Sequence, residues 1–399
     1  MTISRSQSPP KTSSPSRRRK IIRSFVSVAL FAVTTAIVPH LWCGRDAARL
    51  YRGDADVQEG LARGVATWID QDLGTDQYHT GSSQFNGEWL LMTYQLAGLG
   101  FGQTALTHPE SRARNLPMLR KCCARVLKPN AASFDAAAWS EDPVKTLSGK
   151  NGHAGYLGYS NVVLSYDRWI DPAAPDRAVN DRFTAALVRR MTASPTHLIE
   201  TYPGETYPAD NCVAAASIAL AGRATGRDYS PLLKAFGASL RTRYLDPKSG
   251  MLYQSVSSET GKPSGAPRAS GTLFAAYFLS FVDPKLSADL FAAIRRNQVG
   301  ELAGFAAIRE YPAGYQGDMG DVDSGPVIFG LSTSGTAFAI ASARMHGDEA
   351  LFRELESTLT LVAAPTSTRE GNKFLLGGPI GDALLFALLT AQPAPKEVS

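Results

Sequence analysis

The sequence has little cysteine and none of the short motifs that mark common catalytic sites. Its 399 residues include four cysteines, at Cys43, Cys122, Cys123 and Cys212, and no CxxC pair. Adjacent cysteines rarely bond to each other, so neither a disulfide framework nor a zinc site is supported. The chain also lacks a strand–GxGxxG–helix unit, a P-loop, HExxH and GxSxG. Dinucleotide-binding, P-loop and zincin chemistry therefore have no support, and no nucleophile elbow marks a serine hydrolase.

Acidic residues are absent from the first 44 positions, which hold seven Lys and Arg residues. The formal net charge is +5, so the remainder of the chain carries about −2. A slightly acidic domain has no electrostatic footprint for nucleic acid, and we expect no nucleic-acid partner. The basic N-terminal segment is the part suited to anionic lipid headgroups.

The N-terminus combines a basic segment with one long apolar run. Residues 1–20 are rich in Ser, Pro, Arg and Lys, and we expect a disordered cytoplasmic tail. Residues 21–43 follow, with basic residues only on their N-terminal side. We expect a signal anchor that crosses the inner membrane through residues 21–42 and leaves the rest on the periplasmic side. A cleaved signal peptide is the alternative, because the apolar core is short.

Helical periodicity dominates after residue 43. Helices that are apolar all round tend to alternate with amphipathic ones, and the former belong inside a protein. Such pairs arranged in a ring form an α/α toroid. The predicted fold class is therefore all-α, an (α/α)6-type barrel over residues 46–392, with a small β-hairpin turning at Gly250 and a disordered segment at 393–399. The expected helices cover residues 50–73, 87–99, 116–127, 153–170, 177–191, 210–224, 231–244, 270–281, 284–297, 327–345, 349–361 and 380–391.

Polar and aromatic side chains crowd just before the most apolar of these helices. Asp210 stands where an N-cap is expected, so one interpretation is a helix cap with stacked aromatic rings. The alternative is a carboxylate that faces a cavity, where apolar surroundings raise its pKa and suit it to general acid chemistry. The neighbouring candidates for substrate binding are Tyr202, Glu205, Tyr207 and Asn211.

A second group of carboxylates lies in the Gly-rich segment 310–327. It includes Asp321 and Asp323, but the EF-hand spacing is not met, so we predict no metal. These aspartates either face solvent and cap neighbouring helices or supply a second catalytic carboxylate.

One histidine stands among glycines at an expected helix start. The run KNGHAGYLGY holds His153, and its glycines let a ligand or another backbone approach closely. His153 is either structural or the catalytic partner of Asp210. Further substrate-binding candidates are Glu88, Trp139, Tyr156 and Arg309.

Ordered landmarks along the chain resemble the linalool dehydratase/isomerase-like proteins. The resemblance runs from about residue 85 to 392 and implies an α/α-barrel with its pocket at the mouth of the ring. The landmarks are GHAGYLGY at 152–159, DNCVAAASIALAGRATGRDY at 210–229, LDPKSGMLYQSV at 245–256, FVDPKLS at 281–287, IRE at 308–310, SGTAFAIASARMHGDEALF at 334–352 and GDALLFAL at 381–388.

The resemblance also implies a chemistry. Members of that family add or remove water, and shift a double bond, in a small terpene alcohol by acid–base steps, which need no cofactor. The family's histidine matches His153. The positions of its two cysteines hold Thr201 and Asp210 here, and Cys212 is offset by two. The implied general acid is then Asp210, with His153 as its partner and Asp321 or Asp323 assisting.

Two other functions stay open. α/α-Barrels also host glycoside hydrolases and polysaccharide lyases, which use paired carboxylates and aromatic rings, so the substrate is either a small molecule or a glycan. A non-catalytic envelope binding module is the third reading, because the family's thiols are missing. The sequence leaves a homo-oligomer open.

Overall fold

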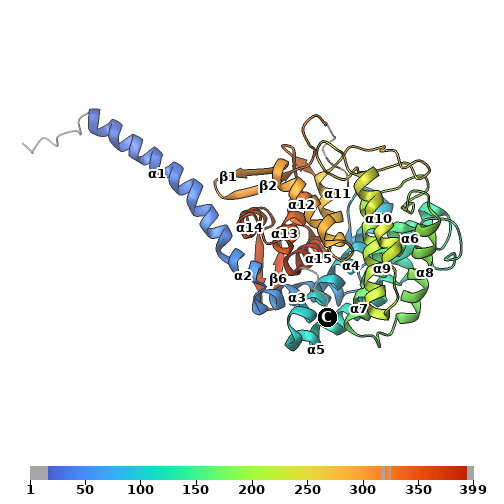
Figure 1. Ribbon diagram of the computed structural model, residues 1–399. Helices are drawn as coiled ribbons and strands as arrows, with labels where there is room; N and C mark the ends of the chain where they lie inside the picture. Colours follow the sequence, from blue (N-terminus) through green and yellow to red (C-terminus); the bar gives the residue numbers. More distant parts are fainter. Residues whose placement is uncertain (1–16, 316–319, 321, 323–324, 393–399) are drawn as a thin grey trace, which may run out of the picture.

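The computed structural model describes residues 17–315, 320, 322 and 325–392. A long helix, α1 (Arg17–Cys43), projects from a compact helical domain (Figure 1). By length and composition α1 could cross a membrane. A signal sequence near an N-terminus can have the same length and composition. It begins at Arg17, inside the segment expected to be disordered. Its last residue, Cys43, is buried in the domain, and a short turn at Gly44–Asp46 leads into α2 (Ala47–Arg52).

A closed ring of helices forms the centre of the described domain. Each inner helix contacts the next one along the chain, and the last contacts the first. This closure confirms the predicted all-α toroid. The inner helices are α4 (Ser83–Thr107), α7 (Ala154–Ile170), α9 (Pro208–Thr225), α11 (Ala269–Leu279), α13 (Thr333–Met345) and α15 (Gly378–Thr390).

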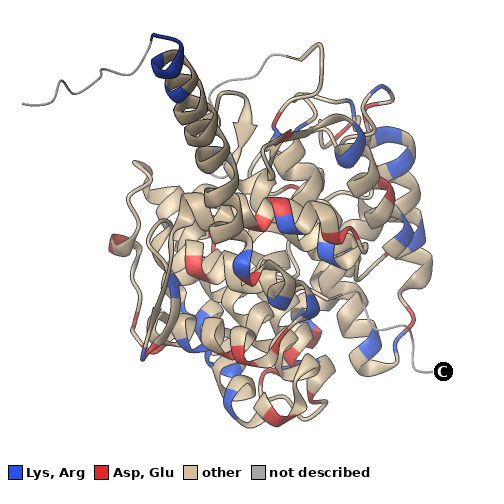
Figure 2. Cartoon of the chain, turned by 90° about the vertical axis from the view of Figure 1, so that its left-hand side faces the viewer, with Lys and Arg blue, Asp and Glu red and all other residues tan. Residues whose placement is uncertain are grey.

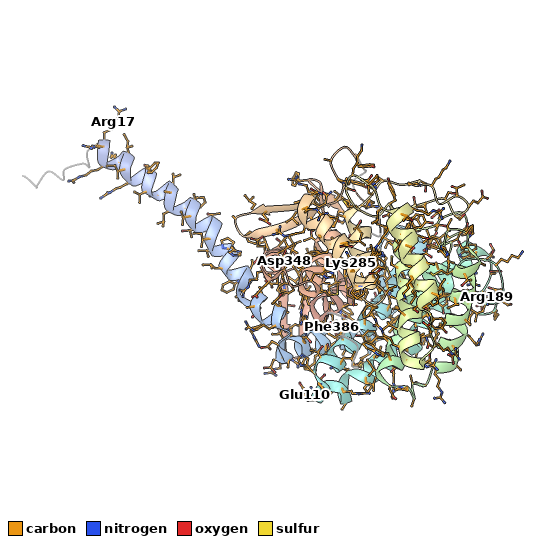
Figure 3. The ribbon with its side chains drawn as sticks, in the orientation of Figure 1. Arg17, Glu110, Arg189, Lys285, Asp348 and Phe386 are labelled. Atoms are coloured by element: carbon orange, nitrogen blue, oxygen red, sulfur yellow. The ribbon has the colours of Figure 1, made fainter. Side chains whose placement is uncertain are left out.

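Small residues and rings fill the spaces between inner helices. A Cβ atom at Gly158 of α7 would meet Ala214 of α9 at 3.3 Å, so glycine sets how closely these two helices pack. The ring closes where Phe101 of α4 meets Phe386 of α15, with ring centroids 5.1 Å apart. Figure 3 shows Phe386 inside the domain, with Arg189 and Lys285 at its periphery.

A second set of helices, several of them amphipathic, surrounds this ring and covers its outer side. In α12, for example, Leu286, Leu290 and Ile294 are buried at helical spacing. The stretch 129–139, not expected to be helical, forms a helix of its own. The outer helices are α3 (Ala55–Ile69), α5 (Arg112–Val126), α6 (Pro129–Trp139), α8 (Arg177–Ala193), α10 (Ser230–Ser239), α12 (Pro284–Asn297) and α14 (Glu349–Ala363).

Short strands lie in the last third of the chain, for which only loops and helices were expected. A four-stranded antiparallel sheet has the order β1-β2-β4-β3, and a separate hairpin joins β5 to β6. The predicted turn at Gly250 is present, with φ +71° and a bridge between Leu245 and Leu252. The strands are β1 (Val299–Leu302), β2 (Phe305–Arg309), β3 (Val327–Ile328), β4 (Leu331–Ser332), β5 (Pro365–Thr368) and β6 (Gly371–Phe374).

Candidate active site

A cavity of about 380 Å³ lies at the N-terminal ends of the inner helices. Five of these helices contribute to its lining through their N-terminal halves, and loops before α9 and α11 supply the rest. Aromatic and aliphatic side chains surround a few polar groups, as in many small-molecule sites. The lining residues are Gln84, Phe85, Glu88, Met92, Tyr159, Tyr202, Glu205, Tyr207, Ala209, Asp210, Gln254, Ser270, Gly271, Phe274, Ser334 and Phe338.

Asp210 lies in the first turn of α9 and lines this cavity. Tyr207 rather than Asp210 is the N-cap residue of α9, and the Asp210 carboxylate has two other partners. It accepts a 2.8 Å hydrogen bond at Oδ1 from the Tyr159 hydroxyl and another of 2.8 Å at Oδ2 from the Thr201 hydroxyl. Burial raises the pKa of Asp210 from 3.8 to about 6, and the two hydroxyl donors limit that rise. The group therefore exchanges protons close to neutral pH.

A second carboxylate enters the cavity from α4. Glu88 is buried, and its Oε2 accepts a 2.6 Å hydrogen bond from the Tyr202 hydroxyl. Burial and the neighbouring Glu88 raise the pKa of Tyr202 above its ordinary value, so the phenol stays protonated and remains a donor. Tyr207 makes a similar bond of 2.7 Å to the exposed Glu205 at the rim.

A buried ion pair holds one wall of the cavity in place. Arg268 Nε lies 2.6 Å from Glu310 Oε1, and Glu310 also accepts bonds from the backbone N–H and hydroxyl of Ser270. The Glu310 carbonyl accepts from the Ala269 N–H. These bonds fasten the start of α11 to the end of β2, which fixes the position of Ser270 in the lining.

The structure places His153 outside the cavity lining, in a buried cluster behind it. Its Nδ1 lies 2.6 Å from Asp135 Oδ2 and its Nε2 lies 2.9 Å from Glu141 Oε1. The ring also packs on Trp139, with centroids 4.9 Å apart. Since both nitrogens have carboxylate partners and the side chain is fully buried, His153 does not contact the cavity.

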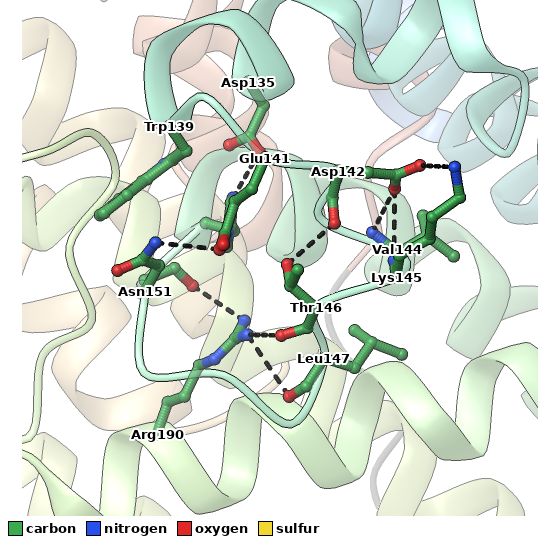
Figure 4. Close-up of polar contacts among 12 residues, drawn as sticks. Asp135, Trp139, Glu141, Asp142, Val144, Lys145, Thr146, Leu147, Asn151 and Arg190 are labelled. Carbon is green, nitrogen blue, oxygen red and sulfur yellow. Dashed lines mark hydrogen bonds and ion pairs between the residues drawn. The ribbon is translucent and has the colours of Figure 1, made fainter.

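Figure 4 shows the loop that this cluster supports. Arg190 of α8 donates to the carbonyls of Thr146, Leu147 and Gly152, and Glu141 accepts from Asn151 at 2.9 Å. The indole of Trp139 donates a 3.2 Å bond to the Thr201 carbonyl. The cluster therefore reaches the cavity indirectly, through the backbone of the residue that bonds Asp210.

Comparisons with known proteins show the family of the chain and its fold. A family model described as linalool dehydratase/isomerase matches residues 177–377. The chain belongs to the linalool dehydratase/isomerase family. The matched part includes Thr201, Asp210, Gln254 and the lining residues from α11 and α13, whereas α4 and Tyr159 lie outside it.

A solved structure from outside this family shares the fold. The crystal structure of an unsaturated glucuronyl hydrolase specific for heparin superposes with a TM-score of 0.52 and 10% sequence identity. The match covers 84% of this chain and 95% of that chain. At this identity the likeness concerns the fold alone.

The other residues singled out from the sequence fall into two groups. Glu88, Tyr202, Glu205 and Tyr207 line the cavity together with Asp210. The remaining ones do not, and their side chains have other surroundings. Asn211 bonds the backbone of Ile199 and Tyr207, Tyr156 donates to the Val126 carbonyl, Trp139 donates to the Thr201 carbonyl, and Arg309 is exposed on β2. Asp321 and Asp323 lie outside the described residues.

Several lining residues were not singled out as site residues. Tyr159 stands in the same GHAGYLGY run as His153, but only the helix geometry shows which of its side chains faces the cavity. Gln254 lies beyond the turn at Gly250, and its Oε1 is buried without a hydrogen-bond partner among the described residues. Phe274 and Phe338 face each other across α11 and α13, with ring centroids 5.2 Å apart, and form the apolar wall.

Within the described residues, no group of three or more His, Cys, Asp or Glu side chains could hold a metal ion. The polar side chains that line the cavity are hydroxyls, amides and three carboxyl groups, those of Glu88, Asp210 and the exposed Glu205, a set suited to proton transfer and hydrogen bonding.

Proposed function

We propose that this protein is an acid–base enzyme of the linalool dehydratase/isomerase type, which adds or removes water at an apolar alcohol. The observation that carries the proposal is the position of Asp210. It is a cavity-lining carboxyl group with a pKa of about 6, held by two hydroxyl donors. Such a group is protonated in a useful fraction near neutral pH and can serve as a general acid.

The proposed dehydration uses two carboxyl groups of the cavity, those of Asp210 and Glu88. Asp210 gives its proton to the hydroxyl oxygen of the substrate, the C–O bond breaks and water leaves. The carboxylate that remains is stabilised by the hydroxyls of Tyr159 and Thr201, which already point at its two oxygens. A proton from the neighbouring carbon passes to Glu88 and the double bond forms. Hydration runs through the same steps in reverse.

The apolar wall supports this chemistry. Met92, Phe274 and Phe338 line the cavity and offer a hydrocarbon substrate a surface without competing hydrogen bonds. A cavity of about 380 Å³ suits a small molecule better than a polymer. Aromatic faces near a developing positive charge on carbon also stabilise it, as they do other cations.

A glycan-active enzyme is the second candidate. It is favoured by the pair of carboxyl groups and by Tyr202 and Tyr207, whose rings could stack on a sugar. An unsaturated glucuronyl hydrolase shares the fold, although at an identity that carries no inference about substrate.

We also propose that α1 anchors the enzyme in a membrane with the domain outside the cytoplasm. Basic residues Arg17 to Arg23 occupy one end of α1, and the domain occupies the other. The positive-inside rule places the basic end in the cytoplasm. Retention of the full chain in the membrane after alkaline carbonate washing, at its uncleaved mass, is the expected result; release of a shortened chain would indicate a cleaved signal sequence.

A substrate panel tests the enzymatic proposal. Purified full chain is incubated with linalool and shorter tertiary allylic alcohols, and in parallel with unsaturated and saturated glucuronides. Dehydration of at least one alcohol, with loss of that activity in Asp210→Asn, supports the first candidate. Hydrolysis of a glucuronide without dehydration of any alcohol would favour the second. Turnover of an alcohol that Asp210→Asn leaves unchanged would remove Asp210 from the mechanism.

A further inference from the structure

Most of the exposed large hydrophobic side chains of the described domain come from the last quarter of the chain. Outside α1, and apart from Leu106, the exposed ones in the described chain lie between residues 302 and 376. We define the apolar face as five of them, which two hairpins and the end of α14 bring together: Leu302, Leu361, Val362, Leu375 and Leu376. Leu302 is 81% exposed and Leu375 is 70% exposed, so little of the protein covers them. A patch of this kind marks an interaction surface.

A chain of contacts connects the apolar face to the end of α1. Leu302 pairs with Phe305 across the β1–β2 turn, and the Phe305 ring packs edge-on against His40 of α1, with centroids 5.8 Å apart. The next residue, Ala306, accepts a 2.7 Å hydrogen bond from Thr358 of α14. Leu361 follows one helical turn later.

The second half of the face joins this chain of contacts through the backbone. The N–H of Leu375 donates to the carbonyl of Ala363 at 3.0 Å, which places Leu375 and Leu376 beside Leu361 and Val362. Figure 1 shows α14, β1 and β2 on the side of the domain from which α1 projects, with α8, α9 and α10 on the opposite side.

No linker separates α1 from the domain. The helix ends at Cys43, which is buried, and the chain continues through a three-residue turn into α2. The uncharged stretch 24–39 and the following residues to Trp42 span roughly 28 Å, close to the thickness of a hydrocarbon core. In Figure 2 the free end of α1 is blue and the remainder tan, so the bilayer fits between that end and the domain.

We propose that the apolar face docks on the lipid bilayer in which α1 is anchored. The β1–β2 turn lies level with His40, in the last turns of the apolar helix, and therefore meets the headgroup region as soon as α1 crosses the membrane. The face then covers its leucines with lipid and fixes the domain on the surface rather than leaving it to swing on α1. This inference rests on the proposed anchoring role of α1, and it goes beyond that role in naming a second, independent membrane contact.

Site-directed fluorescence tests the docking. The four native cysteines are all buried, so a single introduced surface cysteine can be labelled selectively. Four variants of the full chain are compared in phosphatidylcholine vesicles with nitroxide groups on the acyl chains: Leu302→Cys and Leu375→Cys on the apolar face, Val28→Cys in α1, and Leu106→Cys as the matched control. Leu106 is also an exposed leucine, 39% accessible, but it lies near the end of α4 and is not part of the apolar face.

Docking predicts that the lipid quenches the labels at positions 302 and 375 at least twofold more than the label at 106. Quenching at 28 alone, with 302 and 375 equal to 106, would overturn docking and leave the anchor intact. Quenching at 302 and 375 without quenching at 28 would support lipid docking and overturn the anchor. A further outcome is that lipid does not quench the label at 302, whereas a spin-labelled second copy of the chain in detergent does. That result would mean contact between copies and would also overturn docking.

Discussion

The hydroxyl of Thr201 donates a 2.8 Å hydrogen bond to Oδ2 of Asp210. These are the two positions at which the family resemblance implies cysteines. The structure brings them into contact at the wall of the cavity, which Asp210 lines, although they lie nine positions apart along the chain. A hydroxyl and a carboxyl group thus stand where two thiols are expected, and together with Tyr159 they form one hydrogen-bonded unit.

The raised pKa of Asp210 predicts a pH-dependent stability difference. Its folded-state value of about 6 exceeds the ordinary 3.8, so its favourable contribution is full below the ordinary value and is lost as pH rises through about 6. Asp210→Asn carries no charge at any pH. Its free energy of unfolding relative to wild type should therefore increase between pH 4.5 and 8, by about 1–3 kcal/mol. Urea denaturation at several pH values measures this; a difference that does not change with pH would contradict it.

Removing the Tyr159 hydroxyl should raise the pKa of Asp210 further. The phenol donates to the carboxylate at Oδ1 and so stabilises its charged form. In Tyr159→Phe the pKa of Asp210 should rise by roughly one unit, the worth of one hydrogen bond to a charged group. The infrared carbonyl band that Asp210→Asn abolishes identifies the group. Tyr156→Phe is the matched control, because its hydroxyl bonds the Val126 carbonyl, and it should leave the band unchanged.

Because His153 lies in a buried cluster, we expect its substitution to lower the stability of the protein. His153→Gln leaves the buried Asp135 carboxylate without its 2.6 Å partner, and Oδ1 of Asp135 already has none among the described residues. We expect the free energy of unfolding to fall by about 3–5 kcal/mol, as when one member of a buried pair is removed. The exposed His79 is the control, and His79→Gln should change it by less than about 0.5 kcal/mol. Full stability combined with lost turnover in His153→Gln would instead point to a catalytic histidine.

The lowered pKa of Glu141, in the same cluster, predicts a loss of stability at acidic pH. The hydrogen bond from His153 lowers the pKa of Glu141 below its ordinary 4.5. Its contribution to stability is therefore present above pH 4.5 and is lost as pH falls through the lowered value. Wild type should be more stable than Glu141→Gln at neutral pH, and the gap should narrow below pH 4.5. Thermal unfolding of both proteins across this range measures the gap; one that widens on acidification would be the opposite outcome.

The ring was predictable because it depends on local composition. Runs such as the small apolar stretch of α9 have to be inner helices, since they offer no polar face to solvent. α6 was missed because residues 129–139 show no clear apolar stripe and follow α5 almost directly. β1 and β2 were missed because their pairing creates the sheet, whereas each is only four or five residues long.

The site was predictable only in part, because it is assembled from distant segments. Asp210 and its neighbours Tyr202 and Tyr207 were found from their crowding before an apolar helix. The sequence gives no indication that Asp135 and Glu141, 18 and 12 residues away from His153, occupy both of its nitrogens. Nor does it show that Tyr159, 51 residues from Asp210, supplies a donor to it. These contacts depend on how the helices pack.

The most direct test of the proposed mechanism is the rate of alcohol dehydration by wild type and Asp210→Asn between pH 5 and 8. If Asp210 is the general acid, the wild-type rate falls as pH rises through about 6, and Asp210→Asn is slower by a factor of roughly 10² or more at pH 5, a gap that narrows toward pH 8. A rate in Asp210→Asn close to that of wild type, with the same pH dependence, would show that another group donates the proton.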